Sequence, residues 1–343
     1  MNKKEFYQIM KQVPKAEIHI HTEAVISRNT VKKLFKKSTG KTMSSEEMKD
    51  LFSYEDLPGF IAAFLKIQSF FTELSDFDLV FDDFQDYLEE NNIVYCEAFF
   101  SPSAFLKKGF SFHDMSQMIS RNVKKIFDNT GRTLKILIDV SRTFGEENAF
   151  NNLNMILEEK NKNIIGIGLG GDESKGPARD YKNVYAKAKE SKLHTVVHAG
   201  EVEESWSIKD ALDLLGAERI GHGITAAYDP ELIERLAKKK IPLEVCPTSN
   251  TFTKKYVTEM KNHPIKELYQ KGVMVTLNTD DPTFFKASLL DEYYNLYSKL
   301  KFSMADICKI VKNGFNASFM SCAKKKEWCA KVDEILKAPC GSC

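Results

Sequence analysis

The sequence lacks any long apolar run and any marked excess of one charge. Its first residues, MNKKEFYQIMKQVPK, hold no apolar stretch long enough for a signal peptide or a membrane span. We therefore expect a cytoplasmic protein with no membrane partner. The 49 lysine and arginine residues nearly balance the 48 aspartate and glutamate residues, giving a formal charge of +1. Because binding to phosphates relies on an excess of cationic side chains, this balance argues against nucleic acid as a partner.

Paired cysteines and linker-like segments are also missing. The seven cysteines are an odd number and are scattered along the chain, which fits a reduced protein. The C-x-x-C motif from Cys340 to Cys343 has no second pair of ligands, so we expect residues 338–343 to form a flexible tail. No repeat, low-complexity segment or linker divides residues 1–343, which predicts a single domain. No G-x-G-x-x-G turn follows an early predicted strand, which argues against a dinucleotide-binding sheet.

The sequence does contain a regular alternation of short apolar runs and longer amphipathic stretches. Runs such as Ile164-Ile165-Gly166-Ile167 are continuously apolar, which suits parallel strands covered on both faces. Residues 180–192 and 229–239 have helical periodicity and are predicted to be crossover helices. Eight strands alternating with helices predict an α/β fold of the TIM (β/α)8 barrel type. The predicted strands are Ala16–His21, Asn92–Ser101, Thr133–Ser141, Ile164–Gly171, His194–Glu201, Arg219–Ile224, Ile241–Asn250 and Val273–Pro282.

Residues 22–91, between the first two predicted strands, form a longer segment than one crossover requires. Insertions of this kind often cover the active face of a barrel, so we expect a helical insertion that forms a lid. Within it, an apolar stripe follows helical spacing and comprises Leu57, Phe60, Ile61 and Phe64. The stripe is expected to pack on the barrel. The alternative is that Leu57, Phe60 and Phe64 roof a pocket for a flat apolar ligand.

Four of the seven histidines fall at the ends of predicted strands: His19, His21, His198 and His222. In a barrel, the C-terminal strand ends form the face where catalysis takes place. Side chains alternate along a strand with a period of two, so His19 and His21 lie on the same side of the first strand. This pair predicts a metal site. Glycines flank His222 and are expected to leave its ring exposed.

Carboxylates stand beside these histidines. Glu201 follows His198 by three residues and can reach the same site as an acid or a base. Asp280 and Asp281 end the eighth predicted strand, where alone they could equally form a turn or a helix cap. Together, separated segments each bring a zinc-type or acid–base residue to the expected end of a strand. This constellation predicts a metal-dependent hydrolase.

At this point the sequence resembles the adenosine deaminase family of the metal-dependent amidohydrolases over nearly its whole length. The resemblance implies a (β/α)8 barrel, a purine substrate and hydrolytic removal of the 6-amino group. The segments that carry it occur in the family's order: PKAEIHIH, EAFFSP, GLGGDE, HAGE, RIGHGI, CPTSN and LNTDDP.

The resemblance implies one Zn²⁺ per chain, held by His19, His21, His198 and Asp280. Three imidazoles and a carboxylate leave a position open for water, whose pKa zinc lowers to about 7. The activated water would attack C6 of the purine. His222 matches the family residue that orients or deprotonates this water, and Asp280 would also hydrogen-bond it.

The resemblance also assigns groups to the purine ring. Glu201 matches the group that protonates N1. Because a carboxyl that donates a proton at neutral pH needs a raised pKa, we expect Glu201 to be poorly solvated. Asp281 matches the contact to N7, and Gly171 supplies a backbone N–H toward N3. The expected substrate-binding residues are His21, Glu23, Gly171 and Asp281, with the lid residues Leu57, Phe60 and Phe64.

Three features bear on the substrate. Thr22-Glu23-Ala24 replaces the family's usual Leu-Asp-Gly, and Glu at this position is seen in a branch that prefers free adenine. Phe99 replaces an Arg of the usual E-V-R-F-S-P. Conversely, Gly170–Glu173 resembles the nucleoside branch. Adenosine, converted to inosine with release of ammonia, is therefore the first expectation. The alternatives are adenine, converted to hypoxanthine, and a 5′-modified adenosine such as methylthioadenosine or aminodeoxyfutalosine.

Other classes of protein fit less well. A base-editing zinc deaminase would show H-x-E and a later P-C-x-x-C, whereas Pro247 is followed by Thr-Ser-Asn. A binuclear amidohydrolase would place a bridging lysine near the end of the fourth strand, where this chain has Leu169-Gly170-Gly171. A catalytically silent binding protein on the same fold is expected to have lost some of Glu201, His222 and Asp280, and all of them remain.

Overall fold

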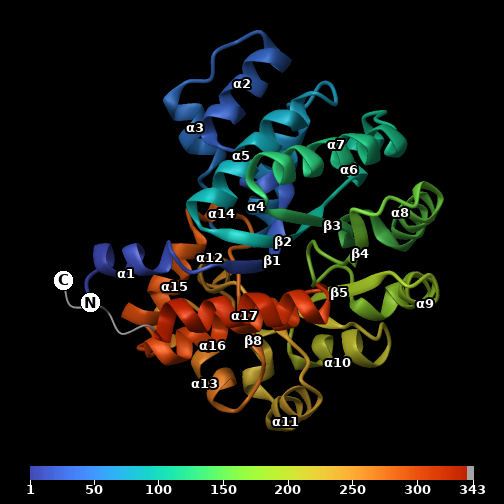
Figure 1. Ribbon diagram of the computed structural model, residues 1–343. Coiled ribbons are helices and arrows are strands. Elements are labelled where there is room, and N and C mark those ends of the chain that lie inside the picture. The colour runs from blue at the N-terminus through green and yellow to red at the C-terminus, as the bar shows by residue number, and fades with distance from the viewer. Residues whose placement is uncertain (338–343) are drawn as a thin grey trace.

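Eight parallel strands form the centre of the fold in the computed structural model, which describes residues 1–337 (Figure 1). They pair in sequence order from β1 to β8. The backbone N–H of His21 donates to the carbonyl of Asp280 at 2.9 Å, which joins the end of β1 to the chain after β8 and closes the ring. The predicted TIM barrel is confirmed. The strands are β1 Lys15–His21, β2 Ile93–Phe100, β3 Thr133–Asp139, β4 Ile164–Gly168, β5 His194–Ala199, β6 Arg219–His222, β7 Leu243–Val245 and β8 Val275–Leu277.

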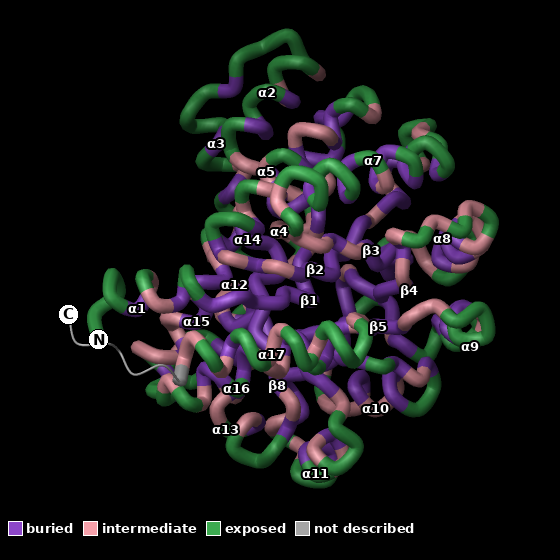
Figure 2. Tube along the Cα trace, in the orientation of Figure 1, coloured by how far each residue is buried: buried purple, intermediate pink, exposed green. Residues whose placement is uncertain are grey.

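The apolar runs of the sequence form strands that are covered on both faces. In β3, Leu134, Ile136, Leu137 and Ile138 are all fully buried, although successive side chains point to opposite faces. Alternate residues thus fill the barrel interior and contact the helices outside it. Figure 2 shows the strands as a buried centre and the outer surfaces of the helices as exposed.

Helices surround the barrel (Figure 1). The stretch at 229–239 forms α11, where Asp229 caps the first turn and Leu232, Ile233 and Leu236 face inward. None of the helices in residues 1–337 is long and apolar enough to cross a membrane. The α-helices are α1 Lys3–Met10, α2 Arg28–Thr39, α3 Ser45–Leu51, α4 Leu57–Ser69, α5 Asp76–Glu90, α6 Ser103–Lys107, α7 Phe112–Thr130, α8 Gly145–Glu159, α9 Lys182–Glu190, α10 Ser205–Asp213, α11 Pro230–Lys239, α12 Pro247–Thr253, α13 Ile265–Gln270, α14 Pro282–Phe285, α15 Leu289–Ser298, α16 Met304–Ala317 and α17 Cys322–Lys337; short 3-10 turns are η1 Thr22–Val25, η2 Arg142–Phe144, η3 Ala178–Tyr181, η4 Ile224–Tyr228 and η5 Met260–Asn262.

The segment at 22–91 contains η1 and the helices α2 to α5, so it is helical as expected. In Figure 1, α2 and α3 project away from the barrel while α4 lies beside α14. Ring contacts join α4 to α14: the ring centroid of Phe60 lies 5.4 Å from that of Phe284, and the centroid of Phe64 lies 5.6 Å from it. The apolar stripe therefore packs on the chain that follows β8.

All the strands after the first are shorter than predicted, and the last two differ most. The run at 241–250 forms β7 only as far as Val245, because Pro247 occupies the first turn of α12. The run at 273–282 leaves the sheet after Leu277. The segments that carry functional side chains thus follow these strands rather than belonging to them. The C-x-x-C motif and the predicted tail at 338–343 lie outside the described residues.

Candidate active site

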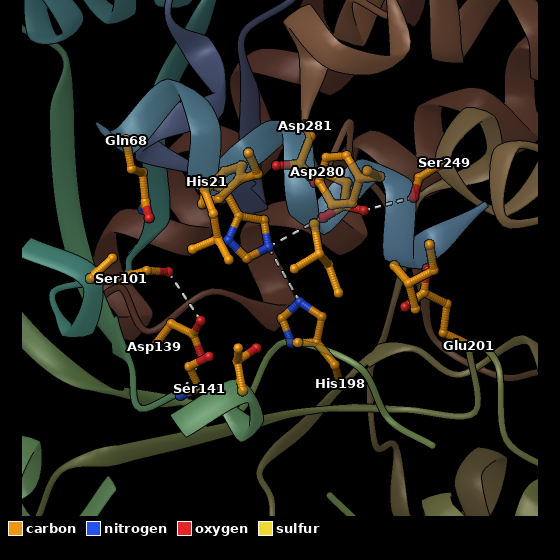
Figure 3. Close-up of a pocket in the computed structure, with 18 of the residues that line it drawn as sticks. His21, Gln68, Ser101, Asp139, Ser141, His198, Glu201, Ser249, Asp280 and Asp281 are labelled. Carbon is orange, nitrogen blue, oxygen red and sulfur yellow. Dashed lines mark hydrogen bonds and ion pairs between the residues drawn. The ribbon is translucent and has the colours of Figure 1, made fainter. Parts of the chain in front are cut away.

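The structure brings together the four side chains that the sequence predicts as metal ligands. They come from β1, β5 and the loop after β8, and one ligand atom of each lies within 4.8 Å of the others. Oδ1 of Asp280 lies 3.4 Å from Nε2 of His19 and 3.3 Å from Nε2 of His21. Nε2 of His198 lies 3.4 Å from Nε2 of His21, and Figure 3 shows the side chains of His21, His198 and Asp280 converging. The cluster stands at the C-terminal ends of the strands, where a barrel carries its active site.

The donor set fits a divalent transition metal. Nε2 of His19 is buried and forms no hydrogen bond with any described residue, which is costly unless another partner is present. Close imidazole nitrogens beside a carboxylate are the ligand arrangement that zinc prefers. The residues present could therefore hold such an ion.

A buried carboxylate orients His19 from behind. Nδ1 of His19 donates to Glu244 at 2.7 Å, and Nε of Arg219 donates to the other oxygen of Glu244 at 2.5 Å. The proton on Nδ1 leaves Nε2 free to bind a metal. Burial lowers the pKa of His19, but Asp280 and Glu244 outweigh it and raise this pKa to about 9. The same negative charge favours a bound cation.

Glu201 follows β5 in a loop that a second glutamate holds in place. The buried carboxylate of Glu173 accepts the backbone N–H groups of residues 200–203 at 2.6 to 3.1 Å. This leaves the Glu201 side chain, which belongs to a residue only 7% exposed, facing the cavity. Burial raises the pKa of Glu201 well above its usual value, and the charges of Asp280 and Glu173 raise it further. Glu201 is poorly solvated, as its predicted acid role requires.

His222 is the last residue of β6 and has a left-handed backbone with φ of 60°. Its Nε2 lies 3.5 Å from Oε2 of Glu201 and 4.0 Å from Oδ2 of Asp280. The expectation that flanking glycines expose this ring is wrong, because His222 is 1% exposed. A side chain on Gly221 would instead come within 2.7 Å of His19, so this glycine makes room for the ligand cluster. Burial lowers the pKa of His222 to about 3, which keeps the ring neutral.

The paired aspartates have opposite protonation tendencies. Burial opposes ionisation of Asp280, but the imidazoles of His19 and His21 hold its pKa well below the usual value. Oδ2 of Asp280 also accepts the hydroxyl of Ser249 at 2.7 Å, as Figure 3 shows. Burial, followed by the charge of Asp280, raises the pKa of Asp281 well above its usual value. Asp281 occupies the N-cap position of α14, as the cap interpretation expects, but its side chain accepts no N–H of that helix.

A cavity of about 740 Å³ opens beside the cluster. Most of its apolar lining residues come from α4 and α14, and most of its polar lining residues come from the ends of the strands and the segments that follow them. Both Phe60 and Phe64 line the cavity and also pack on α14. These residues of the stripe thus combine the two expected positions, packing within the fold and lining a pocket. Gly171, with φ of 95°, also lines the cavity. The lining residues used below are His21, Leu57, Phe60, Phe64, Gln68, Gly171, Glu201, His222, Asp280 and Asp281.

Glu23 lies in η1, hydrogen-bonded to two residues that line the cavity, and is 1% exposed. Its Oε1 accepts the backbone N–H of Ser101 at 2.9 Å and the side-chain amide of Gln68 at 3.3 Å. Its Oε2 is buried and has no hydrogen-bond partner in residues 1–337. Burial raises the pKa of Glu23 to about 7.

The ring of Phe99, at another departure from the family pattern, lies against the ligand cluster. Its centroid is 5.0 Å from that of His19 and 5.2 Å from those of His21 and His198. Gly168 leaves room for it, because a Cβ there would come within 2.5 Å of the ring. Phe99 thus packs behind the imidazoles.

Sequence reasoning missed several polar side chains of the wall. Asp139 ends β3, accepts the backbone N–H groups of Ser141 and Gly170, and receives the hydroxyl of Ser101 at 3.0 Å (Figure 3). A carboxylate at the end of a predicted strand was a usable signal for Asp139. Gln68 lies on α4 beside an apolar stripe and carried no such signal.

Comparison with known proteins identifies relatives along almost the whole chain. The family model described as adenosine deaminase matches residues 14–335. An adenine deaminase from Cupriavidus necator is 30% identical over 335 residues, which cover 96% of this chain and 94% of that protein. The crystal structure of adenine deaminase from Arthrobacter aurescens matches with a TM-score of 0.90 at 26% identity, covering 95% of this chain and 100% of the other. An amidohydrolase from Burkholderia ambifaria, crystallised with bound Zn, has the same fold, with a TM-score of 0.90, 21% identity and coverages of 96% and 93%.

Proposed function

The chain belongs to the adenosine deaminase family, and from this premise we propose that it hydrolyses adenine to hypoxanthine and ammonia at a single bound Zn²⁺. Membership confirms the resemblance carried by the sequence motifs, and the relatives identify the chain as a purine deaminase. The observation that carries the reaction is the set of three carboxyl groups at the ligand cluster. Asp280 favours the ionised form, whereas Glu201 and Asp281 favour the neutral form.

These different protonation states give the three carboxyl groups different roles in the reaction. Glu201, as a neutral acid, donates its proton to N1 of the purine, which weakens the aromaticity of the ring and makes C6 electrophilic. Asp281, also neutral, donates a hydrogen bond to N7, and the backbone N–H of Gly171 faces N3. A zinc ion held by His19, His21, His198 and Asp280 would supply the positive charge that lowers the pKa of the attacking water.

The protons balance across the reaction. Water forms its bond to C6 as one of its protons passes to Asp280, while N1 takes the proton of Glu201. The proton on Asp280 then moves to the amino group, which leaves as ammonia. The new hydroxyl on C6 returns its proton to Glu201. The product carries a carbonyl at C6 and a proton at N1, and both carboxyl groups recover their starting states.

Glu23 supports free adenine as the substrate. Free adenine carries a ring N–H on its five-membered ring, which a nucleoside replaces by a bond to ribose. The unpaired Oε2 of Glu23, behind Gln68 in the cavity wall, is an acceptor of the kind such a donor requires. The relatives named adenine deaminase agree with this choice, as does the occurrence of Glu at this position in the adenine branch.

The Gly170–Glu173 segment, which resembled the nucleoside branch, has another role in this structure. Glu173 binds the backbone of the loop that carries Glu201. Asp172 accepts bonds from Ser174 and pairs with Lys175. Because both acidic side chains are engaged within the protein, the segment does not by itself argue for a ribose. Adenosine, the first expectation from the sequence, becomes the second candidate.

Initial rates measured by ultraviolet absorbance test the substrate. The compounds are adenine, adenosine, methylthioadenosine, aminodeoxyfutalosine and AMP. Adenine is expected to have a kcat/KM at least about 100-fold above that of the nucleosides. A bound nucleoside lacks the ring N–H and would leave the buried Oε2 of Glu23 without a hydrogen-bond donor. AMP is expected to react least, because none of the described residues lining the cavity is lysine or arginine. A higher kcat/KM for adenosine than for adenine would contradict the proposal.

A further inference from the structure

Behind His222, away from Glu201, a chain of buried polar side chains continues toward α13. Nδ1 of His222 lies 3.1 Å from Nδ2 of Asn250. Oδ1 of Asn250 lies 3.2 Å from Nε2 of His263, and Nδ1 of His263 accepts the backbone N–H of Ile265 at 3.1 Å. Asn250 and His263 are buried, and their segments, α12 and the loop before α13, are far from β6 in sequence.

The backbone N–H at the far end of this series of hydrogen bonds fixes which atoms in the series carry protons. A peptide N–H can only donate, so Nδ1 of His263, which accepts from Ile265, carries no proton. The proton of the His263 ring therefore lies on Nε2 and is donated to Asn250, which must present its oxygen. The amide nitrogen of Asn250 is then left to donate to Nδ1 of His222. By the same logic, the proton of His222 lies on Nε2.

We propose that Asn250 and His263 are positioning residues that hold His222 as its Nε2–H tautomer, so that His222 donates a hydrogen bond into the active-site cavity. The sequence left open whether His222 orients or deprotonates the water. With a proton already on Nε2, and with Nδ1 occupied by Asn250, the ring orients the attacking oxygen by donating to its lone pair. The water proton passes to the carboxylate of Asp280, whose Oδ2 is 4.0 Å from Nε2 of His222.

The opposite tautomer would require the amide of Asn250 to turn over. Its NH₂ group would then face the Nε2–H of His263, which would leave two buried donors pointing at each other. These hydrogen bonds, which run from the peptide N–H of Ile265 through His263 and Asn250 to His222, form a relay. The donor–acceptor pattern of the relay is set by that one peptide group. Its catalytic consequence rests on the proposed deaminase function, whereas the tautomer itself does not.

Nitrogen NMR of the zinc-loaded enzyme, labelled with ¹⁵N at histidine, measures the tautomer directly. Two-bond correlations between ring protons and nitrogens distinguish Nε2–H from Nδ1–H, and the signal of His222 is assigned by its loss in His222→Asn. The expected result is a protonated Nε2 and an unprotonated Nδ1. An Nδ1–H tautomer in an active enzyme overturns the relay and leaves the proposed function standing. An Nε2–H tautomer in an enzyme that deaminates no purine supports the relay and contradicts the proposed function.

Three variants test the cause. Asn250→Asp replaces the donor that faces His222 by an acceptor of the same shape, so the proton of His222 is expected to move to Nδ1. The expected kcat falls roughly 10–100-fold, with zinc content unchanged. Retention of the Nε2–H tautomer with unchanged kcat would overturn the proposal. His263→Gln keeps a donor toward Asn250 and is expected to keep tautomer and kcat, whereas His263→Ala is expected to lose both. Equal tautomer populations in these two variants would also overturn it, even if Asn250→Asp does not fold.

Discussion

Glu244 accepts the Nδ1 proton of His19 at 2.7 Å, and this one contact leaves Nε2 of the buried imidazole, which lies 3.4 Å from Asp280, free to bind a metal. Arg219 lies on the other side of Glu244, donates to its other carboxylate oxygen and holds it in place. The strand β7 therefore contributes to the ligand cluster without providing a ligand itself.

Glu244→Gln is predicted to weaken zinc binding by roughly 10–100-fold, because the neutral amide no longer raises the basicity of His19. Competition with a chelator of known affinity measures this change. Glu218→Gln, at a partly exposed glutamate that hydrogen-bonds His194, is the matched control and is expected to leave zinc affinity unchanged. Equal affinities for Glu244→Gln and the unaltered enzyme would contradict the orienting role of Glu244.

Glu201→Gln is predicted to lower kcat by roughly 10²–10⁴-fold, because the amide cannot give a proton to N1. Zinc content, measured by atomic absorption, is expected to stay at the level of the unaltered enzyme. Glu204→Gln changes a neighbouring exposed glutamate in the same loop and serves as the control. Turnover near normal in Glu201→Gln would remove this residue from the acid role.

The pH dependence follows from the raised pKa of Glu201. An acid must be protonated to act, so kcat/KM is predicted to hold at neutral pH and to fall as pH rises through the pKa of Glu201 in the folded enzyme. An ordinary glutamate, with a pKa of about 4.3, would already have lost its proton. A pH–rate profile on adenine measures the descending limb. A fall centred near the ordinary glutamate value would contradict the buried, neutral state of Glu201.

Phe60→Asn is predicted to raise KM for adenine more than it lowers thermal stability, because the ring faces the cavity as well as α14. Phe127→Asn is the control, since Phe127 lies on α7 and is 55% exposed. Initial rates and thermal unfolding of the same preparations separate the two effects. Clear destabilisation of Phe60→Asn with an unchanged KM would assign the α4 stripe to packing alone.

The barrel and its ligand cluster were predictable because local patterns encode them. Parallel strands covered on both faces leave continuous apolar runs, and a barrel directs all the ends of its strands to one face. His19 and His21 share a side of β1 through simple alternation. Asp280 was placed correctly even though β8 ends at Leu277, because the loop after a strand opens on the same face.

The supporting contacts were not predictable from the sequence, because they join segments that only the tertiary fold brings together. His263 precedes α13 with no pattern around it, yet it sets the amide of Asn250. Gln68 donates a hydrogen bond to Glu23 from α4, a helix whose sequence showed only an apolar stripe. The expected exposure of His222 was wrong for a related reason: Gly221 is small to accommodate His19, a constraint that arises across the sheet.

Removal and return of the metal test the central claim most directly. The enzyme is stripped with a chelator, verified as metal-free by elemental analysis, and titrated with Zn²⁺ while adenine deamination is followed. The account predicts that activity is lost on stripping and returns in full at one zinc per chain. Full activity in the verified metal-free protein, or a requirement for two zinc ions per chain, would contradict it.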